Sequence, residues 1–131
     1  MKTDEEIKTD MFKFIKGSAL HQAVTGKLSK RKRPKGSDKE DILISILANE
    51  NGQVQIAYVN VNIYVKDDLI DGQHEEATQR LTQLSRLADD LLGEFYGQEY
   101  TLTLLSQRVM EVPEAGEHVI NNKVEYKSIN E

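Results

Sequence analysis

The segment from Gln73 to Phe95 carries an apolar stripe that constrains the fold more than any other part of the chain. Its apolar residues follow one another at alternating steps of four and three, namely Ala77, Leu81, Leu84, Ala88, Leu91 and Phe95. This spacing places them along one face of an α-helix, opposite a polar face. Because the stripe is shorter than the roughly three heptads that indicate a coiled coil, we expect a helix that packs across a sheet.

Two stretches before this helix have the pattern of paired strands. In residues 42–47 apolar side chains point to both faces, which predicts a strand covered on both sides. Asn51-Gly52 is typical of a hairpin turn, and residues 53–68 alternate as the returning strand. The apolar positions of that strand change parity near Ala57-Tyr58. This change indicates either a β-bulge or a strand that passes from one sheet environment into another.

Helices are predicted at the start of the chain as well. Residues 3–16 have helical apolar spacing, with acidic residues in the first turn, where the helix dipole favours negative charge. Ser18 can cap a short second helix that Gly26 ends. We interpret residues 67–72, which contain three aspartates, as a polar connector.

Two further strands complete the expected fold. They follow Gly97 and are joined by a turn at residues 113–116. We therefore expect residues 1–131 to form one α+β domain. Its mainly antiparallel sheet of about four strands would pack against the N-terminal helix and the long amphipathic helix.

Residues 27–41, KLSKRKRPKGSDKED, form a positive segment in an acidic protein. Seven Lys or Arg and three acidic residues give this segment +4, and because the whole chain carries −5, the remainder carries −9. Nucleic-acid binders usually combine such cations with aromatic side chains that stack on bases. No aromatic residue lies between Phe14 and Tyr58, so the pattern favours a solvated loop or a protein contact over base-specific recognition.

Two binding hypotheses for this segment stay open. The candidate contact residues are Lys27, Lys30, Arg31, Lys32, Arg33 and Lys35. They could hold nucleic-acid phosphates without sequence preference, an interaction that weakens steeply with salt. Alternatively, a basic loop on an acidic body suits head-to-tail self-association, a contact that can close into a ring.

The sequence offers no residue pattern for catalysis or for a bound cofactor. It has no cysteine, and His21, His74 and His118 are far apart, without a partner at the spacing of metal ligands. It also lacks the glycine loop that binds nucleotide phosphates. We expect no catalytic, cofactor-binding or metal-binding residue, and we expect that the chain is not an enzyme.

Membrane contact is not expected either. No apolar run reaches the roughly 20 residues of a membrane span. The acidic N-terminus lacks the apolar stretch of a secretory signal, which predicts a protein that stays in the compartment where it is made.

The stretch TGKLSKRKRPKGSDKEDILISIL, followed by VNVNIYV, resembles the tail-completion proteins of tailed bacteriophages and prophages. A glycine precedes an exposed stretch with turn-forming and charged residues, after which come a buried strand at 42–47 and a Val/Asn strand at 59–65. The residues that carry this pattern are Gly26, Arg33-Pro34, Ser37 and Glu40-Asp41.

The resemblance implies a tail terminator, which caps the tail tube and helps to join the tail to the head without catalysis. Such proteins commonly act as hexameric rings. The implied partners are other copies of the chain, the tail tube protein and the head–tail connector protein. The implied location is the host bacterial cytoplasm during assembly and then the virion tail.

The same resemblance assigns contact surfaces. The loop from Lys27 to Lys39 and the long strand would contact a neighbouring subunit or the tube. On that strand the alternation alone places Tyr58, Asn60, Asn62 and Tyr64 on one face, which could pair with another subunit, although such a face is more often the solvent side of a sheet. If the loop faces the lumen of the ring, its cations line the path of the DNA. Two alternatives belong to other classes: a small module that binds nucleic acid through residues 27–39, and an enzyme, which has the least support.

Overall fold

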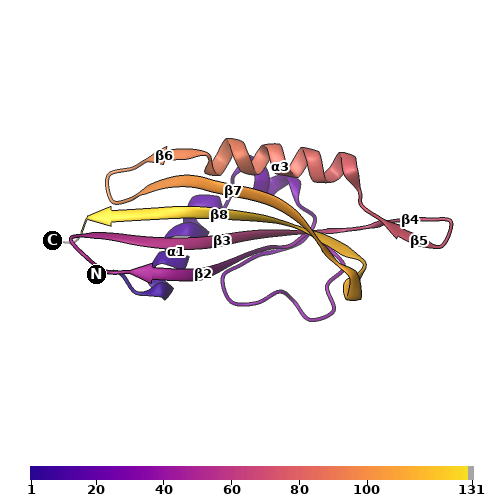
Figure 1. Ribbon diagram of the computed structural model, residues 1–131, viewed down its shortest axis with the longest axis horizontal. Helices are drawn as coiled ribbons and strands as arrows, with labels where there is room; N and C mark the ends of the chain where they lie inside the picture. The colour runs from indigo at the N-terminus through magenta and orange to yellow at the C-terminus, as the bar shows by residue number, and fades with distance from the viewer. Residues whose placement is uncertain (130–131) are drawn as a thin grey trace.

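The computed structural model describes residues 1–129, which form a long sheet that curls like half of a barrel. Within these residues the sheet has six strands in the order β1-β2-β3-β8-β7-β6, and a separate two-stranded hairpin, β4–β5, projects from one end (Figure 1). The helices pack on one face of the sheet and share a single core with it.

The strands are β1 (Leu28–Ser29), β2 (Ile42–Glu50), β3 (Val54–Lys66), β4 (Asp68–Ile70), β5 (Gln73–Glu75), β6 (Glu94–Tyr96), β7 (Thr101–Val112) and β8 (Glu117–Ile129). The helices are α1 (Asp4–Ile15), α2 (Ala19–Ala23), α3 (Thr78–Leu92) and a 3-10 turn, η1 (Pro113–Ala115).

The expected α+β fold with its small four-stranded sheet is wrong. The protein is mostly β, with 45% of its residues in strands, and the sheet is mixed because β1 runs parallel to β2. The four strands that the sequence predicts are present as β2, β3, β7 and β8. The others are two or three residues long, too short to show any periodicity.

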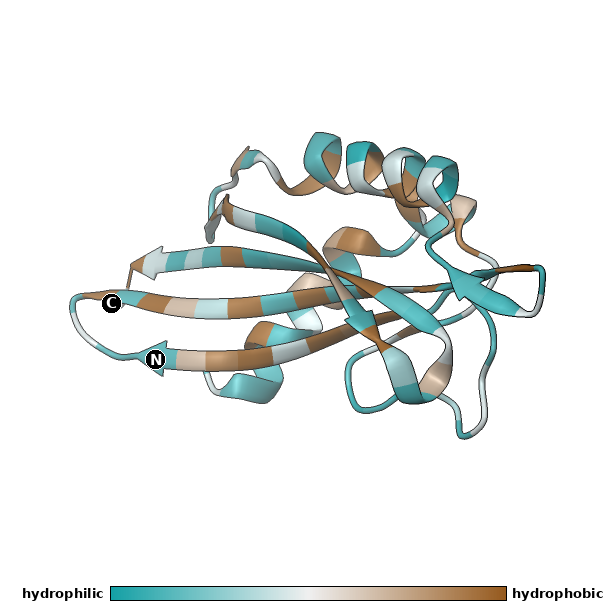
Figure 2. Cartoon of the chain, turned by 45° about the vertical axis from the view of Figure 1, so that its right-hand side comes forward, coloured by the Kyte–Doolittle hydropathy of each residue, from teal (hydrophilic) through white to brown (hydrophobic). Residues whose placement is uncertain are grey.

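The strands β3 and β8 form the centre of the sheet and pair over their whole length, from Val54 opposite Ile129 to Lys66 opposite Glu117. Along both strands hydrophobic and hydrophilic residues alternate (Figure 2). The apolar set faces the helices, and the polar set forms the outer face of the sheet. The alternation therefore decides which face carries the core.

Two bulges lie on either side of this central pair. Leu47 of β2 is the extra residue between Ile46 and Ala48, and Leu105 of β7 is the extra residue between Leu104 and Ser106. Ile46 and Leu104 lie in the same row of the sheet, because both are aligned with the Val59–Val124 pair. Since a bulge bends its strand and increases its twist, the paired bulges account for the curl.

Two expectations about the first hairpin are wrong. β2 is not covered on both sides, because Leu47 is 57% exposed. The bulge is on β2, opposite Tyr58 and Val59, and not in β3, which keeps one uninterrupted alternation. The apparent change of parity arises because Gln55 occupies an inward position: it is fully buried and hydrogen-bonds the backbone N–H and carbonyl of Lys2.

The predicted amphipathic helix is confirmed as α3, which buries Leu81, Leu84, Ala88 and Leu92. It is shorter than the stripe, because residues 73–75 and 94–96 are strands at its two ends. The helix lies along β7 at the top of Figure 1, and α1 packs against β2. These helices thus complete the barrel-like enclosure of the core.

The N-terminal helix α1 is held by a capping box and by a polar anchor. Thr3 and Glu6 cap its first turn, and Asp10 accepts a hydrogen bond from the Tyr126 hydroxyl at 2.7 Å. Lys2 Nζ also lies 2.6 Å from the Asp10 carboxylate. Burial, and then the hydrogen bond to Asp10, raise the pKa of Tyr126, which therefore stays neutral and fixes α1 on β8.

Candidate functional site

Arg33 lies at the centre of an ionic cluster and not on the free surface of the basic segment. Its Nε lies 2.9 Å from Asp41 Oδ2, and its Nη1 and Nη2 each lie 2.9 Å from a carboxylate oxygen of Glu117. Its guanidinium carbon lies 4.0 Å from the centre of the Tyr64 ring, a favourable cation–π distance. The side chains of Asp41 and Glu117 are 2% and 5% exposed, so Arg33 is the cation that pairs with two buried carboxylates.

The carboxylate of Asp41 collects the hydrogen bonds that shape the loop. It accepts from the backbone N–H of Lys27 at 2.8 Å and from the Ser37 hydroxyl at 2.6 Å. Burial alone would raise the pKa of Asp41. The hydrogen bonds from Ser37, Lys27 and Arg33, together with the charge of Arg33, outweigh burial and hold this pKa below its ordinary value.

A second ion pair ties the same loop to α3. Arg80 Nε lies 2.6 Å from Glu40 Oε2, and Arg80 Nη2 lies 2.7 Å from Glu40 Oε1. The Glu40 backbone N–H donates to the Thr25 hydroxyl, and the Thr25 N–H donates to the Glu40 carboxylate. The two ends of the loop, at residues 25 and 40, are therefore bonded to each other and to the helix.

Gly26 is required by the closeness of these two ends. A Cβ atom at this position would lie 2.1 Å from Asp41 Oδ1 and 2.6 Å from the Glu40 carbonyl oxygen. The Gly26 N–H donates to that carbonyl at 2.8 Å. Any side chain here would push the two loop ends apart.

Of the residues that carry the sequence resemblance, Gly26, Arg33, Ser37, Glu40 and Asp41 thus belong to one structural unit. We call this unit the ionic clasp: Gly26, Arg33, Ser37, Glu40, Asp41, Arg80 and Glu117. It joins the base of the basic loop to β8 and α3, through Glu117 and Arg80. The residue pattern therefore specifies the contacts that hold the loop in place. The other cationic side chains of residues 27–35 take no part in these contacts.

The other candidate cations of the segment have a different environment from Arg33. Lys27, Arg31, Lys32 and Lys35 are exposed, and Lys30 is half-buried with its Nζ 2.7 Å from the Thr9 hydroxyl oxygen. Lys30, Arg31, Lys32 and Lys35 lie on the loop that follows β1, and Lys27 lies at its base, whereas the Arg33 side chain turns into the ionic clasp. We call Lys27, Lys30, Arg31, Lys32 and Lys35 the free cations.

The predicted contact strand lies on the outer face of the sheet. Tyr58, Asn60, Asn62 and Tyr64 are half-buried and all point away from the core. Because β3 is hydrogen-bonded to β2 on one side and to β8 on the other, its backbone cannot pair with another subunit. Only the side chains of this face can make such a contact.

These side chains are already engaged with their neighbours. The amide of Asn121 donates to the side-chain oxygen of Asn62 at 2.7 Å and to that of Asn60 at 3.3 Å. Lys123 Nζ lies 5.3 Å from the centre of the Tyr58 ring. The strand thus contributes to an ordered polar face, to which residues of β8 and residues of β3 both contribute side chains.

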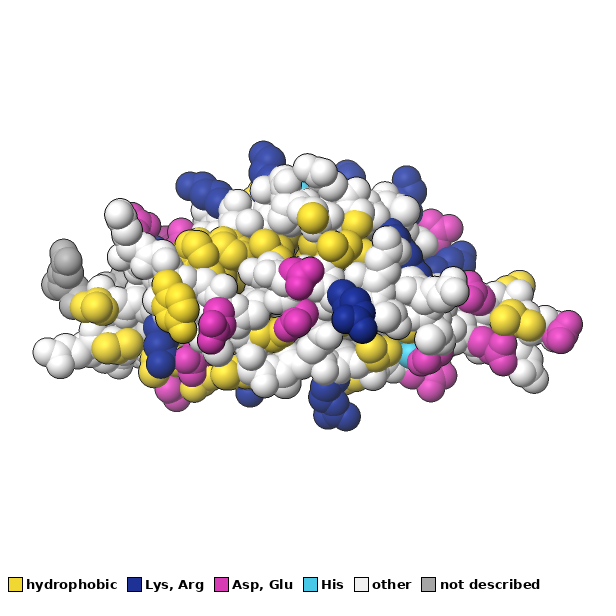
Figure 3. All heavy atoms as spheres, turned by 90° about the horizontal axis from the view of Figure 1, so that it is seen from above, with side chains coloured by type: hydrophobic (Ala, Val, Ile, Leu, Met, Phe, Trp, Pro, Cys, Tyr) yellow, Lys and Arg dark blue, Asp and Glu magenta, His cyan; other side chains and the backbone are white. Residues whose placement is uncertain are grey.

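The hairpin β4–β5 was missed by the sequence reasoning, which treated residues 67–72 as a connector. Its turn is Asp71-Gly72, and both residues have positive φ, at 50° and 78°. Asp-Gly between two short extended stretches is a hairpin signal and could have identified it. The acidic and apolar side chains of the hairpin gather at one end of the molecule, on the right of Figure 3.

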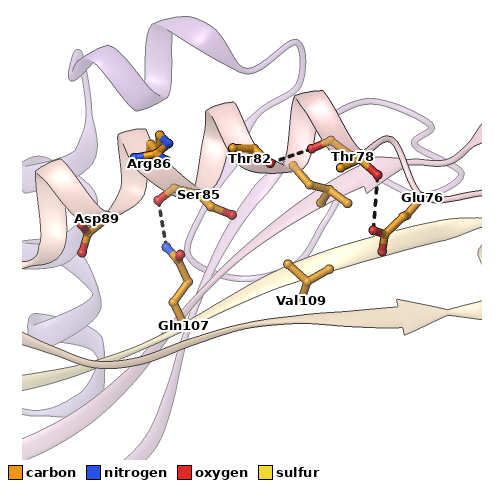
Figure 4. Close-up of a pocket in the computed structure, with 9 residues that line it drawn as sticks. Glu76, Thr78, Thr82, Ser85, Arg86, Asp89, Gln107 and Val109 are labelled. Atoms are coloured by element: carbon orange, nitrogen blue, oxygen red, sulfur yellow. Dashed lines mark hydrogen bonds between the residues drawn. The ribbon is translucent and has the colours of Figure 1, made fainter.

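A groove of about 340 Å³ lies between α3 and β7 (Figure 4). Gln107 crosses it and donates to the Ser85 carbonyl at 2.9 Å and to the Asn122 side-chain oxygen at 2.8 Å. At its end the Thr78 hydroxyl donates to the Glu76 carboxylate. Gln107 therefore connects α3 to β7 and β8 across this groove.

Two kinds of site are missing from residues 1–129. No helix there is both long enough and apolar enough to cross a membrane. No three histidine or acidic side chains of that range are grouped to hold a metal ion.

No protein-family model matches the chain, and no curated protein matches its sequence. Its own geometry and its local sequence pattern are therefore the basis for a functional proposal.

Proposed function

We propose that this chain is a structural subunit of a phage or prophage tail-completion ring, which caps the tail tube and helps to join the tail to the head. The ionic clasp is the observation that carries the proposal. All the resembling positions except Pro34 converge on this one set of contacts, which holds a basic loop at a defined place on the fold. Such a pattern suits a protein that works by presenting surfaces to other proteins.

The distribution of charge supports assembly in a ring. The segment 27–41 carries +4 and the rest of the chain −9, so each copy presents surfaces of opposite sign. A contact between unlike surfaces of identical subunits is heterologous, and it closes into a ring when its rotation permits. In such a ring the outer sheet face and the loop would serve the contacts to the tail tube and the connector.

A second candidate function is supported by the exposure of the free cations. Arg31, Lys32 and Lys35 are all exposed and could contact phosphates, either of DNA in the lumen of a ring or as an independent nucleic-acid-binding module. The acidic remainder of the chain opposes such binding, so this function ranks below assembly.

The test of the assembly role is electron microscopy of particles from an induced lysogen that lacks this gene. We expect overlong tails, or tails that never join filled heads, and rescue by the wild-type gene supplied in trans. Normal infectious particles from the deletion strain would overturn the proposal.

A matched pair of variants refines this test. Arg31, Lys32 and Lys35 changed together to Ala remove three exposed cations from the loop, and Lys13, Lys16 and Arg86 changed together to Ala remove three exposed cations elsewhere. We expect the loop variant to fail in rescue and the control variant to succeed. Equal rescue by both would exclude the loop from tail completion.

A further inference from the structure

The hairpin β4–β5 presents apolar side chains to solvent on an acidic arm. Leu69 is 67% exposed and Ile70 is 49% exposed, although both are large and apolar. Residues 67–76 contain five acidic residues and no Lys or Arg, so the arm carries −5. We call residues 67–76 the acidic arm.

Like charges face each other directly on this arm. Asp68 and Glu75 are cross-strand partners in the hairpin, and both are exposed. Two carboxylates in directly opposite positions destabilise a strand pair, and an isolated two-stranded hairpin is at best marginally stable in water. A cation from outside the arm would relieve this repulsion, and a covering surface would remove the exposed apolar area from water.

The base of the acidic arm is held in a defined direction. His118 Nδ1 lies 2.5 Å from Asp67 Oδ1, and the Asp67 N–H donates to the Gly116 carbonyl at 3.0 Å. On the other side of the base, His118 Nε2 lies 3.8 Å from Glu76 Oε2. Both ends of the arm therefore meet the same residue of β8, so the arm is presented at a fixed position.

The free cations have the complementary properties. These five residues, at the base of the loop and along it, carry +5; four of them are exposed, and the ionic clasp holds the loop in place. Long aliphatic stems of Lys and Arg can cover apolar side chains while their charged ends meet carboxylates. The arm and the loop leave the molecule in different directions in Figures 1 and 2, so within one copy they do not cover each other.

We propose that the acidic arm of one copy docks on the free cations of a second copy, with Asp68 and Glu75 facing Arg31 and Lys32. This inference rests on the proposed function, because the docking would supply the repeated heterologous contact from which the proposed ring is built. Each copy offers one arm and one loop, so every subunit gives and receives one such contact.

A charge-swap experiment on the full chain tests the docking. The arm variant is Asp68→Lys with Glu75→Lys, and the loop variant is Arg31→Glu with Lys32→Glu. By sedimentation equilibrium we expect the wild type to self-associate and each variant alone to associate more than about tenfold more weakly, because like charges then meet. Mixing the two variants should restore association, since both kinds of contact become complementary again.

Crosslinking checks the same contact without reversing charge, and the absence of cysteine from the natural chain makes it specific. Leu69→Cys mixed with Lys32→Cys should give covalent dimers with a short bismaleimide, whereas Leu69→Cys mixed with Thr82→Cys should not. Thr82 is exposed on α3 and serves as the control position.

Several results would overturn the docking. In the charge-swap experiment these are a wild type that stays monomeric at every concentration, single variants that associate as strongly as the wild type, or a mixture of the two variants that does not regain association. In the crosslinking experiment, the contradicting result is equal crosslinking of Leu69→Cys to Lys32→Cys and to Thr82→Cys. A loop variant that loses retention on a 30-mer oligonucleotide while it associates normally would assign the loop to nucleic acid instead.

The tail-completion proposal and the docking proposal can be contradicted independently of each other. Normal tails from the deletion strain, together with arm-dependent association, would remove the tail role and leave the docking in place. Overlong tails, together with association that ignores the charge swaps, would do the reverse.

Discussion

Individual residues of the basic segment have unlike roles, although the sequence shows them as one run of charge. Arg33 bridges two buried carboxylates and stacks on Tyr64, while its neighbours Arg31 and Lys32 are exposed. A guanidinium can bond two carboxylates at once because its N–H groups are arranged in a planar fork. The position of Arg33 therefore makes it a structural residue.

Replacement of Arg33 by Ala should lower the free energy of unfolding by about 3–5 kcal/mol, because Asp41 and Glu117 would remain buried without their cation. Urea unfolding measures the change. Arg31→Ala is the control and should stay within about 0.5 kcal/mol of the wild type. Equal stability of the two variants would show that the clasp does not hold the loop.

The lowered pKa of Asp41 predicts acid sensitivity. A carboxyl whose folded pKa lies below its unfolded value stabilises the fold at a pH above the unfolded value, and this stability is lost as the pH falls through the folded pKa. We expect urea unfolding between about pH 5 and pH 2 to show a smaller loss of stability for Asp41→Asn than for the wild type. Parallel curves would contradict this assignment.

At the level of elements, the apolar residues of α3 are buried or half-buried, whereas those of the acidic arm are exposed to solvent. Leu84 of α3 is fully buried in the core, whereas Leu69 and Ile70 of the arm face solvent. The arm is thus outside the core that gives the protein its stability, and its apolar residues are free for a contact with another molecule.

Leu69→Ala combined with Ile70→Ala should therefore leave the free energy of unfolding within about 0.5 kcal/mol of the wild type. Leu84→Ala should cost about 2–5 kcal/mol, because it leaves a cavity in the core. Thermal and urea unfolding compare the two variants. A large loss of stability in the arm variant would mean that the arm is part of the folding unit.

At the level of the whole molecule, the separation of charge governs how copies meet. The arm carries −5 and the free cations carry +5, while the chain as a whole is acidic. Copies therefore repel one another in most orientations and attract one another in the orientation that brings arm to loop. Such complementarity selects one contact geometry more than it adds raw affinity.

Self-association should accordingly weaken with ionic strength. Between about 0.15 M and 1 M salt the screening length falls from about 8 Å to about 3 Å, so the attraction between arm and loop decreases. Sedimentation equilibrium across this range should show progressive dissociation. Association that strengthens with salt would indicate a mainly apolar interface elsewhere on the surface.

Local periodicity was enough to predict α3, the N-terminal helix and the four long strands. Each of these elements repeats its apolar positions over at least two turns or several residue pairs, and this signal depends only on neighbours in the chain. The single positive segment was also evident from charge alone. The role of Tyr58, Asn60, Asn62 and Tyr64 in subunit contact stays a prediction.

Only the tertiary structure decided what the short elements and the charged residues do. β1, β6 and the arm are too short to carry a period, and Gln55 broke the pattern of β3 because its partner, Lys2, is distant in sequence. Arg33 has a different role from the free cations because its guanidinium pairs with Glu117, which lies on the last strand. Charge and length can be read along the chain, but burial and pairing arise between segments that only folding brings together.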